Sequence, residues 1–147
     1  MQISILNFIQ EHAIFHSDMV YDESRKSFNM NSYENNHPGI YFILDGDDLL
    51  KIGKADGNTG LKGRISTYRT RLVRSYETGD QTTILWHTVM TGNLKSKKLK
   101  MYVLPIDPIK VSFKGVEVNA MMARSLEKKL SELANIQGHS MMLSGQN

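Results

Sequence analysis

The chain has 147 residues, of which 40% are hydrophobic, 22% are charged and none is cysteine. This length allows one domain with a sizeable core, and the lack of cysteine excludes a disulfide framework and a thiolate metal site. The longest apolar run is Ile40 to Leu44, far short of the roughly 20 residues that cross a bilayer. No basic residue precedes Arg25, so we expect no secretory signal and no membrane segment. We expect an intracellular, cytoplasmic location, or the host-cell cytoplasm if a phage or virus encodes the chain.

Charge is unevenly distributed along the chain. Residues 1–50 hold eight acids and two bases, a net of −6, whereas residues 51–147 hold 16 bases and seven acids, a net of +9. Two stretches, 57–76 and 81–106, contain basic residues but no acid. One such cluster is as readily a solvated basic face, but two clusters and an opposed acidic segment favour a polyphosphate partner, a nucleic acid.

The N-terminal half begins with apolar residues at near-helical spacing, which predicts a short helix over 3–14. Residues 17–37 are polar and rich in Asn and Ser, and predict an irregular arm. His37-Pro38-Gly39 then breaks the chain before a predicted strand at 40–44. Asp45-Gly46-Asp47 is typical of a hairpin turn, so 49–54 is the predicted returning strand. We expect a helix and arm at 1–36, a core at 37–137 and a tail at 138–147.

The register of this hairpin follows from its pattern of apolar residues. A three-residue loop centred on Gly46 places Tyr41 opposite Lys51 and Gly39 opposite Gly53. One face then carries the apolar side chains of Ile40, Phe42, Leu44, Leu50 and Ile52. A slip of one residue would mix apolar with polar positions on both faces, so we expect this register. Tyr41 and Lys51 are predicted to lie side by side on the more polar face.

The remaining elements are predicted from spacing and turn residues. Leu61, Ile65, Tyr68 and Leu72 form the buried stripe of a helix over 61–74. A second helix is expected at 82–90, a strand at 99–104 and a hairpin at 110–118. A last helix, capped by Asn119, is expected to run to about residue 134.

The last predicted helix has a carboxylate on its packing side. Its apolar stripe is Ala123, Leu126, Leu130 and Leu133, and Glu127 falls inside the same arc. A buried carboxylate is costly unless it is paired or binds a metal. The alternatives are therefore a Glu paired with an Arg and a metal ligand, and the position within the apolar arc favours the ligand.

An ordered set of motifs lies across residues 38–135. It comprises Gly39-Ile40-Tyr41, then Lys51-Ile52-Gly53, then Arg64 and Tyr68 four residues apart, and finally Glu127 in a late helix. Each motif is weak alone, but their order and contexts resemble the GIY-YIG nuclease superfamily. The resemblance implies an α+β fold, with a small central antiparallel β-sheet flanked by helices, and metal-dependent hydrolysis of DNA phosphodiester bonds.

The resemblance implies a catalytic role for five residues. Glu127 would hold the single Mg²⁺ (Mn²⁺ could substitute), an ion that needs only one or two carboxylates. Arg64 would contact phosphate oxygens through its fixed guanidinium fork. Tyr41 would act as general base or orient the attacking water, and nearby cations, Lys51 and Arg64, would favour its ionised form. Tyr68 would hydrogen-bond within the same cluster, although a core tyrosine is nearly as good an interpretation.

The sequence departs from the family pattern in two places. Lys51 replaces the second tyrosine of the motif, as it does in some restriction and phage members. The family Asn after the Glu helix has no clean counterpart, because Asn135 is too close and His139 lies only near the usual place.

Double-stranded DNA is the expected partner, and two classes of function stay open. A chain this small would read DNA through loops around the core or as a homodimer, in the manner of a stand-alone restriction-type or phage-type endonuclease. The alternative is a degenerate nucleic-acid-binding module of the same fold. Basic residues outside the catalytic set are candidate phosphate contacts: Lys54, Arg69, Arg71, Arg74, Lys95, Lys97 and Lys98.

Overall fold

The computed structural model describes residues 3–70 and 97–143. The described helices and strands, in chain order, are α1 (Ile5–His12), β1 (Ile14–Asp22), β2 (Ser27–Asn29), β3 (Gly39–Asp45), β4 (Asp48–Ala55), α2 (Gly60–Thr70), β5 (Lys98–Pro105), β6 (Ile109–Phe113), β7 (Val116–Ala120) and α5 (Ala123–Ile136). The chain is therefore α+β, as the sequence predicts.

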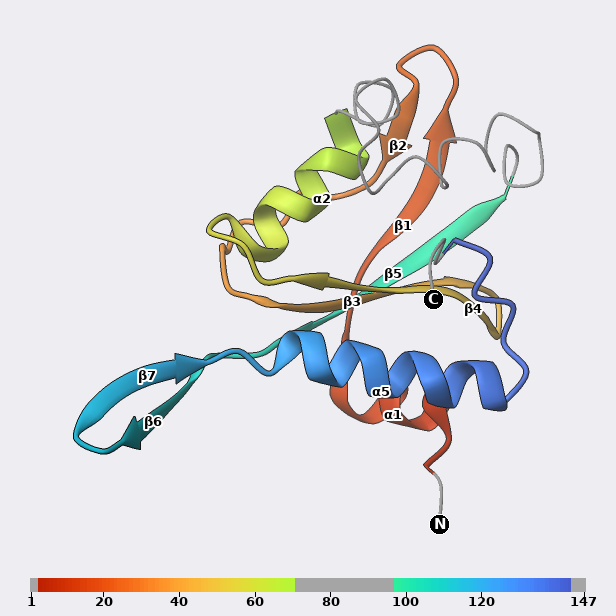
Figure 1. Cartoon of the computed structure of the whole chain (residues 1–147). Helices are drawn as coiled ribbons and strands as arrows, with labels where there is room; N and C mark the ends of the chain where they lie inside the picture. The colour runs from red at the N-terminus through yellow and green to blue at the C-terminus, as the bar shows by residue number, and fades with distance from the viewer. Residues whose placement is uncertain (1–2, 71–96, 144–147) are drawn as a thin grey trace.

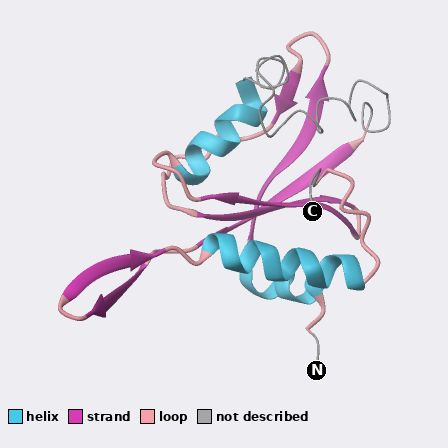
Figure 2. Cartoon of the chain, viewed as in Figure 1, coloured by secondary structure: helices cyan, strands magenta, loops and turns pink. Residues whose placement is uncertain are grey.

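A central antiparallel sheet organises the described chain. Its strand order is β2-β1-β5-β3-β4, so β5 is the central strand and β4 lies at one edge beside β3. Helix α2 covers one face of the sheet, and α5 and α1 lie together on the other, as Figure 1 and Figure 2 show. This arrangement confirms the predicted antiparallel sheet flanked by helices.

Each face of the sheet has its own hydrophobic core. On the α2 face, Tyr41, Ile43 and Leu50 pack with Leu61 and Tyr68. On the α5 face, apolar side chains of β3 and β4 pack against both helices: Ile40, Phe42, Ile52, Ala123, Leu130, Ile5 and Ile9. The alternation of β3 side chains between two buried faces explains why its sequence is almost continuously apolar.

The prediction of an irregular arm at 17–37 was wrong for β1 and β2. β1 pairs with β5 through residues 14–20, and β2 pairs with the end of β1. The polar Ser17 is buried in β1, where its hydroxyl accepts the backbone N–H of Asn31 at 2.9 Å. Because this hydroxyl is satisfied, a polar residue is tolerated inside the strand.

The predicted register of the β3–β4 hairpin was also wrong. Tyr41 lies opposite Gly53, and Gly39 lies opposite Ala55. Asp45 pairs with Asp48 around a two-residue turn, and the register shifts between Ile43 and Leu44. A two-residue turn alone would have put Phe42 opposite Lys51, and the shift restores Ile52 as its partner.

The register shift changes the face of one residue and preserves the others. Leu50 packs in the core on the α2 face, although the sequence predicts it on the face of Ile40 and Phe42. Tyr41, Lys51 and Gly53 share the α2 face, as predicted, because Lys51 is the partner of Ile43. Tyr41 and Lys51 are therefore diagonal neighbours rather than a directly opposed pair.

The C-terminal segment is packed against the edge strand. The N–H groups of Met141 and Leu143 donate to the carbonyls of Leu49 and Leu50, each at 3.0 Å. Both residues are buried. Residues 138–143 therefore protect the first half of β4, which would otherwise be an open edge.

The other predicted elements are confirmed with small changes. α1 and β5 lie where the spacing predicts them, and α2 begins at Gly60. The predicted 110–118 hairpin is β6–β7, but Asn119 belongs to β7 and α5 begins at Ala123 with Met122 as its N-cap. The predicted 82–90 helix and the last turn of the 61–74 helix lie outside the described residues. Among the helices of residues 3–70 and 97–143, none is long and apolar enough to cross a membrane.

Candidate active site

Two tyrosine hydroxyls meet between the sheet and α2. Tyr41 comes from β3 and Tyr68 from α2, and their hydroxyl oxygens lie 2.7 Å apart in a hydrogen bond that either could donate. The rings meet edge to face, with centroids 5.7 Å apart. Both side chains are buried, so the contact is shielded from competing water.

Glycines shape the space that the phenols occupy. A Cβ at Gly53 would overlap the Tyr41 ring, which lies directly over this residue. Gly60 begins α2 at φ +56°, and a Cβ there would overlap the carbonyls of Asn36 and His37. The N–H of Leu61 donates to the same His37 carbonyl at 3.0 Å. The glycines therefore let α2 approach the start of β3 closely enough for Tyr68 to reach Tyr41.

Glu127 lies in a charged cluster on the other side of β4. It is half-buried on α5, the helix that packs on β4. Burial raises the pKa of Glu127 above the ordinary value of a glutamate, and the ammonium groups of Lys54 and Lys51 act in the opposite direction. The carboxylate of Asp56 raises this pKa further and the Arg124 guanidinium lowers it. A half-buried acid that keeps two lysines nearby is suited to a charged ligand.

Lys51 lies between the tyrosine pair and the charged cluster around Glu127. It shares the α2 face of β4 with Tyr41, and its charge acts on Glu127. Its Nζ also donates to the Leu143 carbonyl at 3.4 Å, at the margin of hydrogen-bond distance. Lys54 lies opposite Ile40, on the α5 face, as strict alternation predicts. The candidate site therefore spans the edge strand β4, with phenols on one face and the acid on the other.

The sequence analysis overlooked two members of the charged cluster. Asp56 directly follows β4, and Arg124 lies three residues before Glu127 on α5, so both flank the candidate ligand. Arg124 Nε and Asp56 Oδ2 are 3.9 Å apart. Arg124 could have been predicted from its spacing, because residues three apart on a helix are neighbours. Asp56 could not, because its position near Glu127 depends on how α5 packs on β4.

The structure places Arg64 on α2, one turn before Tyr68 and half-buried. Three other predicted phosphate contacts have partners within the chain. Arg69 Nε donates to the Met30 carbonyl at 3.0 Å, Lys97 Nζ is 2.8 Å from Asp45, and Lys98 Nζ is 3.4 Å from Asp18. The remaining predicted phosphate contacts Arg71, Arg74 and Lys95 lie outside the described residues.

His139 is the residue nearest to the place of the family Asn. Its Nδ1 accepts the N–H of Leu49 at 3.1 Å and lies 3.8 Å from Asp48 Oδ1. This ring therefore fastens the C-terminal segment to the start of β4, a structural task.

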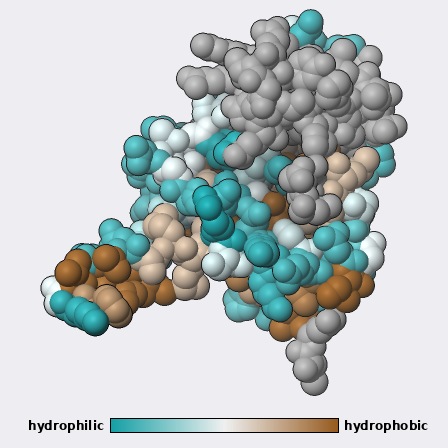
Figure 3. All heavy atoms as spheres, viewed as in Figure 1, coloured by the Kyte–Doolittle hydropathy of each residue, from teal (hydrophilic) through white to brown (hydrophobic). Residues whose placement is uncertain are grey.

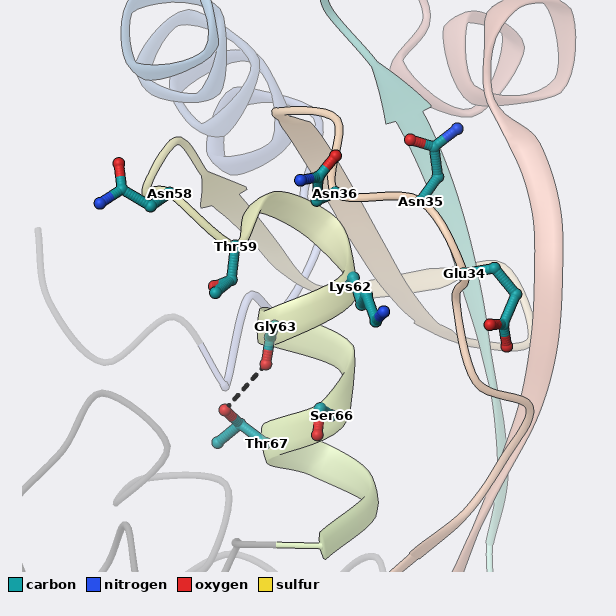
Figure 4. Close-up of a pocket in the computed structure, with 9 residues that line it drawn as sticks. All are labelled: Glu34, Asn35, Asn36, Asn58, Thr59, Lys62, Gly63, Ser66 and Thr67. Atoms are coloured by element: carbon teal, nitrogen blue, oxygen red, sulfur yellow. Dashed lines mark hydrogen bonds between the residues drawn. The ribbon is translucent and has the colours of Figure 1, made fainter.

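A separate polar cleft of about 810 Å³ is lined by α2, the turn before it and residues 34–36. Figure 4 shows Asn58 and Thr59 at the start of the helix and Ser66 and Thr67 further along it. Residues 34–36, Lys62 and Gly63 complete the lining. None of the five predicted catalytic residues lines this cleft.

Among solved structures, two nucleases are similar to this chain in fold. Bacteriophage T4 EndoII, solved as a mutant, aligns with a TM-score of 0.65 at 21% identity, over 89% of this chain and 95% of EndoII. The restriction endonuclease HPY188I, solved in complex with product DNA, aligns with a TM-score of 0.54 at 18% identity, over 94% of this chain and 82% of that protein. No protein-family model and no curated protein sequence matches. The chain therefore has the fold of these nucleases.

Proposed function

We propose that the protein is a DNA endonuclease of the GIY-YIG superfamily that hydrolyses phosphodiester bonds with Mg²⁺. The observation that carries this proposal is the position of Lys51, which shares a strand face with Tyr41 while its charge acts on Glu127. The sequence motif requires these three side chains at one site. The fold likeness to a restriction endonuclease solved with its product DNA supports the substrate class.

The chain's residues suit the parts of a phosphoryl transfer. In the proposed reaction a water oxygen bonds to phosphorus, the bond to the leaving oxygen breaks, and that oxygen takes a proton from solvent. The Tyr41 hydroxyl oxygen orients the attacking water by accepting a hydrogen bond from it, and the proton that this water loses passes to solvent. The Tyr68 hydroxyl, 2.7 Å away, orients the Tyr41 hydroxyl. Lys51 and Arg64 place positive charge beside the phosphate oxygens, where negative charge grows in the transition state.

The residues around Glu127 fit a Mg²⁺ ion. Burial penalises the free carboxylate, and a cation would remove that penalty by neutralising its charge. Asp56 is close enough to act on Glu127 and would supply a second oxygen ligand, which suits an ion held by one or two carboxylates. In the described residues, no group of three His, Asp or Glu side chains forms a metal cage. When bound, Mg²⁺ would supply charge stabilisation at the leaving oxygen.

Plasmid cleavage tests this function. The wild type should nick or linearise supercoiled DNA with Mg²⁺ or Mn²⁺ and stop when EDTA is added. Glu127→Gln should abolish cutting and leave DNA binding intact, because the amide is a poor Mg²⁺ ligand of the same shape. Glu132→Gln is the matched control, since this exposed residue of the same helix lies outside the cluster, and it should cut normally.

Two results would contradict the proposal. Full activity of Glu127→Gln would remove that residue from the mechanism. A wild type that shifts DNA but leaves the plasmid intact with Mg²⁺ and Mn²⁺ at every pH would establish the binding-module alternative. One observation favours this alternative: His139 Nδ1 accepts a hydrogen bond from the N–H of Leu49. Among the described residues, His139 is the one nearest to the place of the family Asn, and this bond gives it a structural role.

A further inference from the structure

The β6–β7 hairpin projects from the body of the molecule (Figure 1). Its strands pair with one another in a two-stranded sheet separate from the central one. All ten strand residues are exposed. An isolated two-stranded hairpin is marginally stable in water, so this element needs a partner surface that the described chain does not supply.

One face of the hairpin is entirely apolar. The cross-strand pairs on that face are Ile109 with Ala120, Val111 with Val118, and Phe113 with Val116. Phe113 is 67% exposed and Val116 61%. Figure 3 shows hydrophobic residues gathered on this projection. We refer to these six side chains as the apolar hairpin face.

The charged side chains of the hairpin lie on its opposite face. Lys110 and Ser112 pair across the strands with Asn119 and Glu117, and Lys110 Nζ is 3.6 Å from Glu117 Oε1. The turn residue Lys114 is the exception, because its Nζ lies 5.6 Å from the centroid of the Phe113 ring at the tip. A surface for DNA would carry several cations across the contact face, whereas the six side chains of this face are all uncharged. A strongly acidic or basic protein partner would likewise find little complementary charge there.

We propose that the apolar hairpin face binds the same face of a second copy of this chain. Apart from Lys114 at the tip, this face is uncharged and can meet itself without repulsion along its length, and such self-complementarity is what a two-fold dimer interface requires. The five large side chains expose roughly 500 Å² per chain, so the pair would bury about 1,000 Å², which reaches the lower bound for a specific interface.

The sizes of the side chains select one arrangement of the two copies. Phe113 and Val116 are at the tip, and the small Ala120 lies at the base beside Ile109. A two-fold axis that runs across the strands at the Val111–Val118 pair sets the tip of each hairpin against the base of the other. Phe113 then faces Ile109 of the second copy, Val116 faces the small Ala120, and Val111 faces Val111. The bulky tip residues are thereby distributed to both ends of the interface instead of meeting at one end.

Light scattering after size exclusion tests the proposal. The wild type should be a dimer, and Val111→Lys should raise the dimer dissociation constant at least about 100-fold because it buries a charge. Ser112→Lys, on the polar face of the same strand, is the matched control and should remain dimeric. Circular dichroism shows whether each variant keeps its fold.

Chemical cross-linking tests the arrangement without disturbing the hairpin. The chain has no cysteine, so a single introduced thiol reports one position. Val111→Cys should give a covalent dimer with a short bismaleimide, and Ser112→Cys should give several-fold less. A monomeric wild type at high concentration, or equal cross-linking of the two variants, would overturn the proposal. So would a monomer whose DNA affinity falls in Val111→Lys, since the face would then contact DNA. These outcomes are independent of whether the protein cuts DNA.

Discussion

The two faces of the β3–β4 hairpin differ in the environment of their polar groups. On the α2 face, two phenols are buried and share one hydrogen bond. On the α5 face, Glu127 is half-buried among charges of both signs, and its burial is only partly offset. The first arrangement is one that a stable core tolerates at little cost. The half-buried carboxylate of Glu127 lowers the stability of the free protein. Such a cost is expected at a site whose charge is neutralised only when a ligand binds.

The largest expected effect comes from the residue that relates the two faces. Lys51→Met should lower the rate of plasmid cleavage about 100-fold, because it removes positive charge from the phosphate. Lys129→Met, at an exposed position on α5, should leave the rate unchanged. If both variants cut at the wild-type rate, Lys51 does not link the phenols to Glu127 in catalysis.

A second substitution disturbs the α2 face alone. Gly53→Ala should cost about 1–3 kcal/mol of unfolding free energy, because the added methyl group forces the buried Tyr41 ring to move. Gly57→Ala is the matched control, since a Cβ there meets nothing within 4 Å. Urea unfolding followed by circular dichroism measures both, and equal stabilities would mean that Tyr41 does not pack over Gly53.

The phenol pair can be tested by a double-mutant cycle. Tyr41→Phe and Tyr68→Phe should each cost about 1–2 kcal/mol, since each leaves one buried hydroxyl without this partner. The double variant should be less destabilised than the sum of the two, because both hydroxyls leave together. Strictly additive losses in urea unfolding would show that the two hydroxyls do not interact.

The smallest effect concerns stability and pH on the α5 face. Because the pKa of Glu127 is raised in the folded protein, the native state binds more protons than the unfolded state around that pKa, and stability falls as pH rises through it. Glu127→Gln should therefore be at least as stable as the wild type at neutral pH. Its advantage should shrink as the pH falls from the raised pKa towards the ordinary pKa of a glutamate, and should be lost below that ordinary value. Thermal unfolding at several pH values measures this, and an advantage that grows towards acid pH would contradict the sign.

The sequence was sufficient for the parts of the fold that depend on local pattern. Alternation placed Tyr41, Lys51 and Gly53 on one face, and helical spacing put Glu127 beside the apolar stripe of α5. β1 carried a readable signal that its polar composition obscured, since Ser17, Met19 and Tyr21 alternate as buried positions. The segment was predicted as an irregular arm because it is polar. The alternation of its buried residues with a period of two predicts a strand and was the more reliable observation.

Other features depend on contacts between distant segments. The register shift beside Leu50 is set by packing on both faces of β4 and by the C-terminal segment that bonds to Leu49 and Leu50. Asp56 reaches the charged cluster only because α5 packs on β4. Residue spacing within one segment does not predict contacts between distant segments. The sequence therefore predicted which residues belong to the candidate site, but not that they lie on two faces of the edge strand β4.

The most direct test of a site that spans β4 is the titration of Glu127 by carboxyl NMR in the wild type and in Lys51→Met and Lys54→Met. The account predicts a pKa above the ordinary value of a glutamate in the wild type, raised further in both variants, and more by loss of Lys54 than of Lys51. A Glu127 pKa that does not change in Lys51→Met would contradict the account, because the Lys51 ammonium, on the face of Tyr41, would then have no electrostatic effect on Glu127.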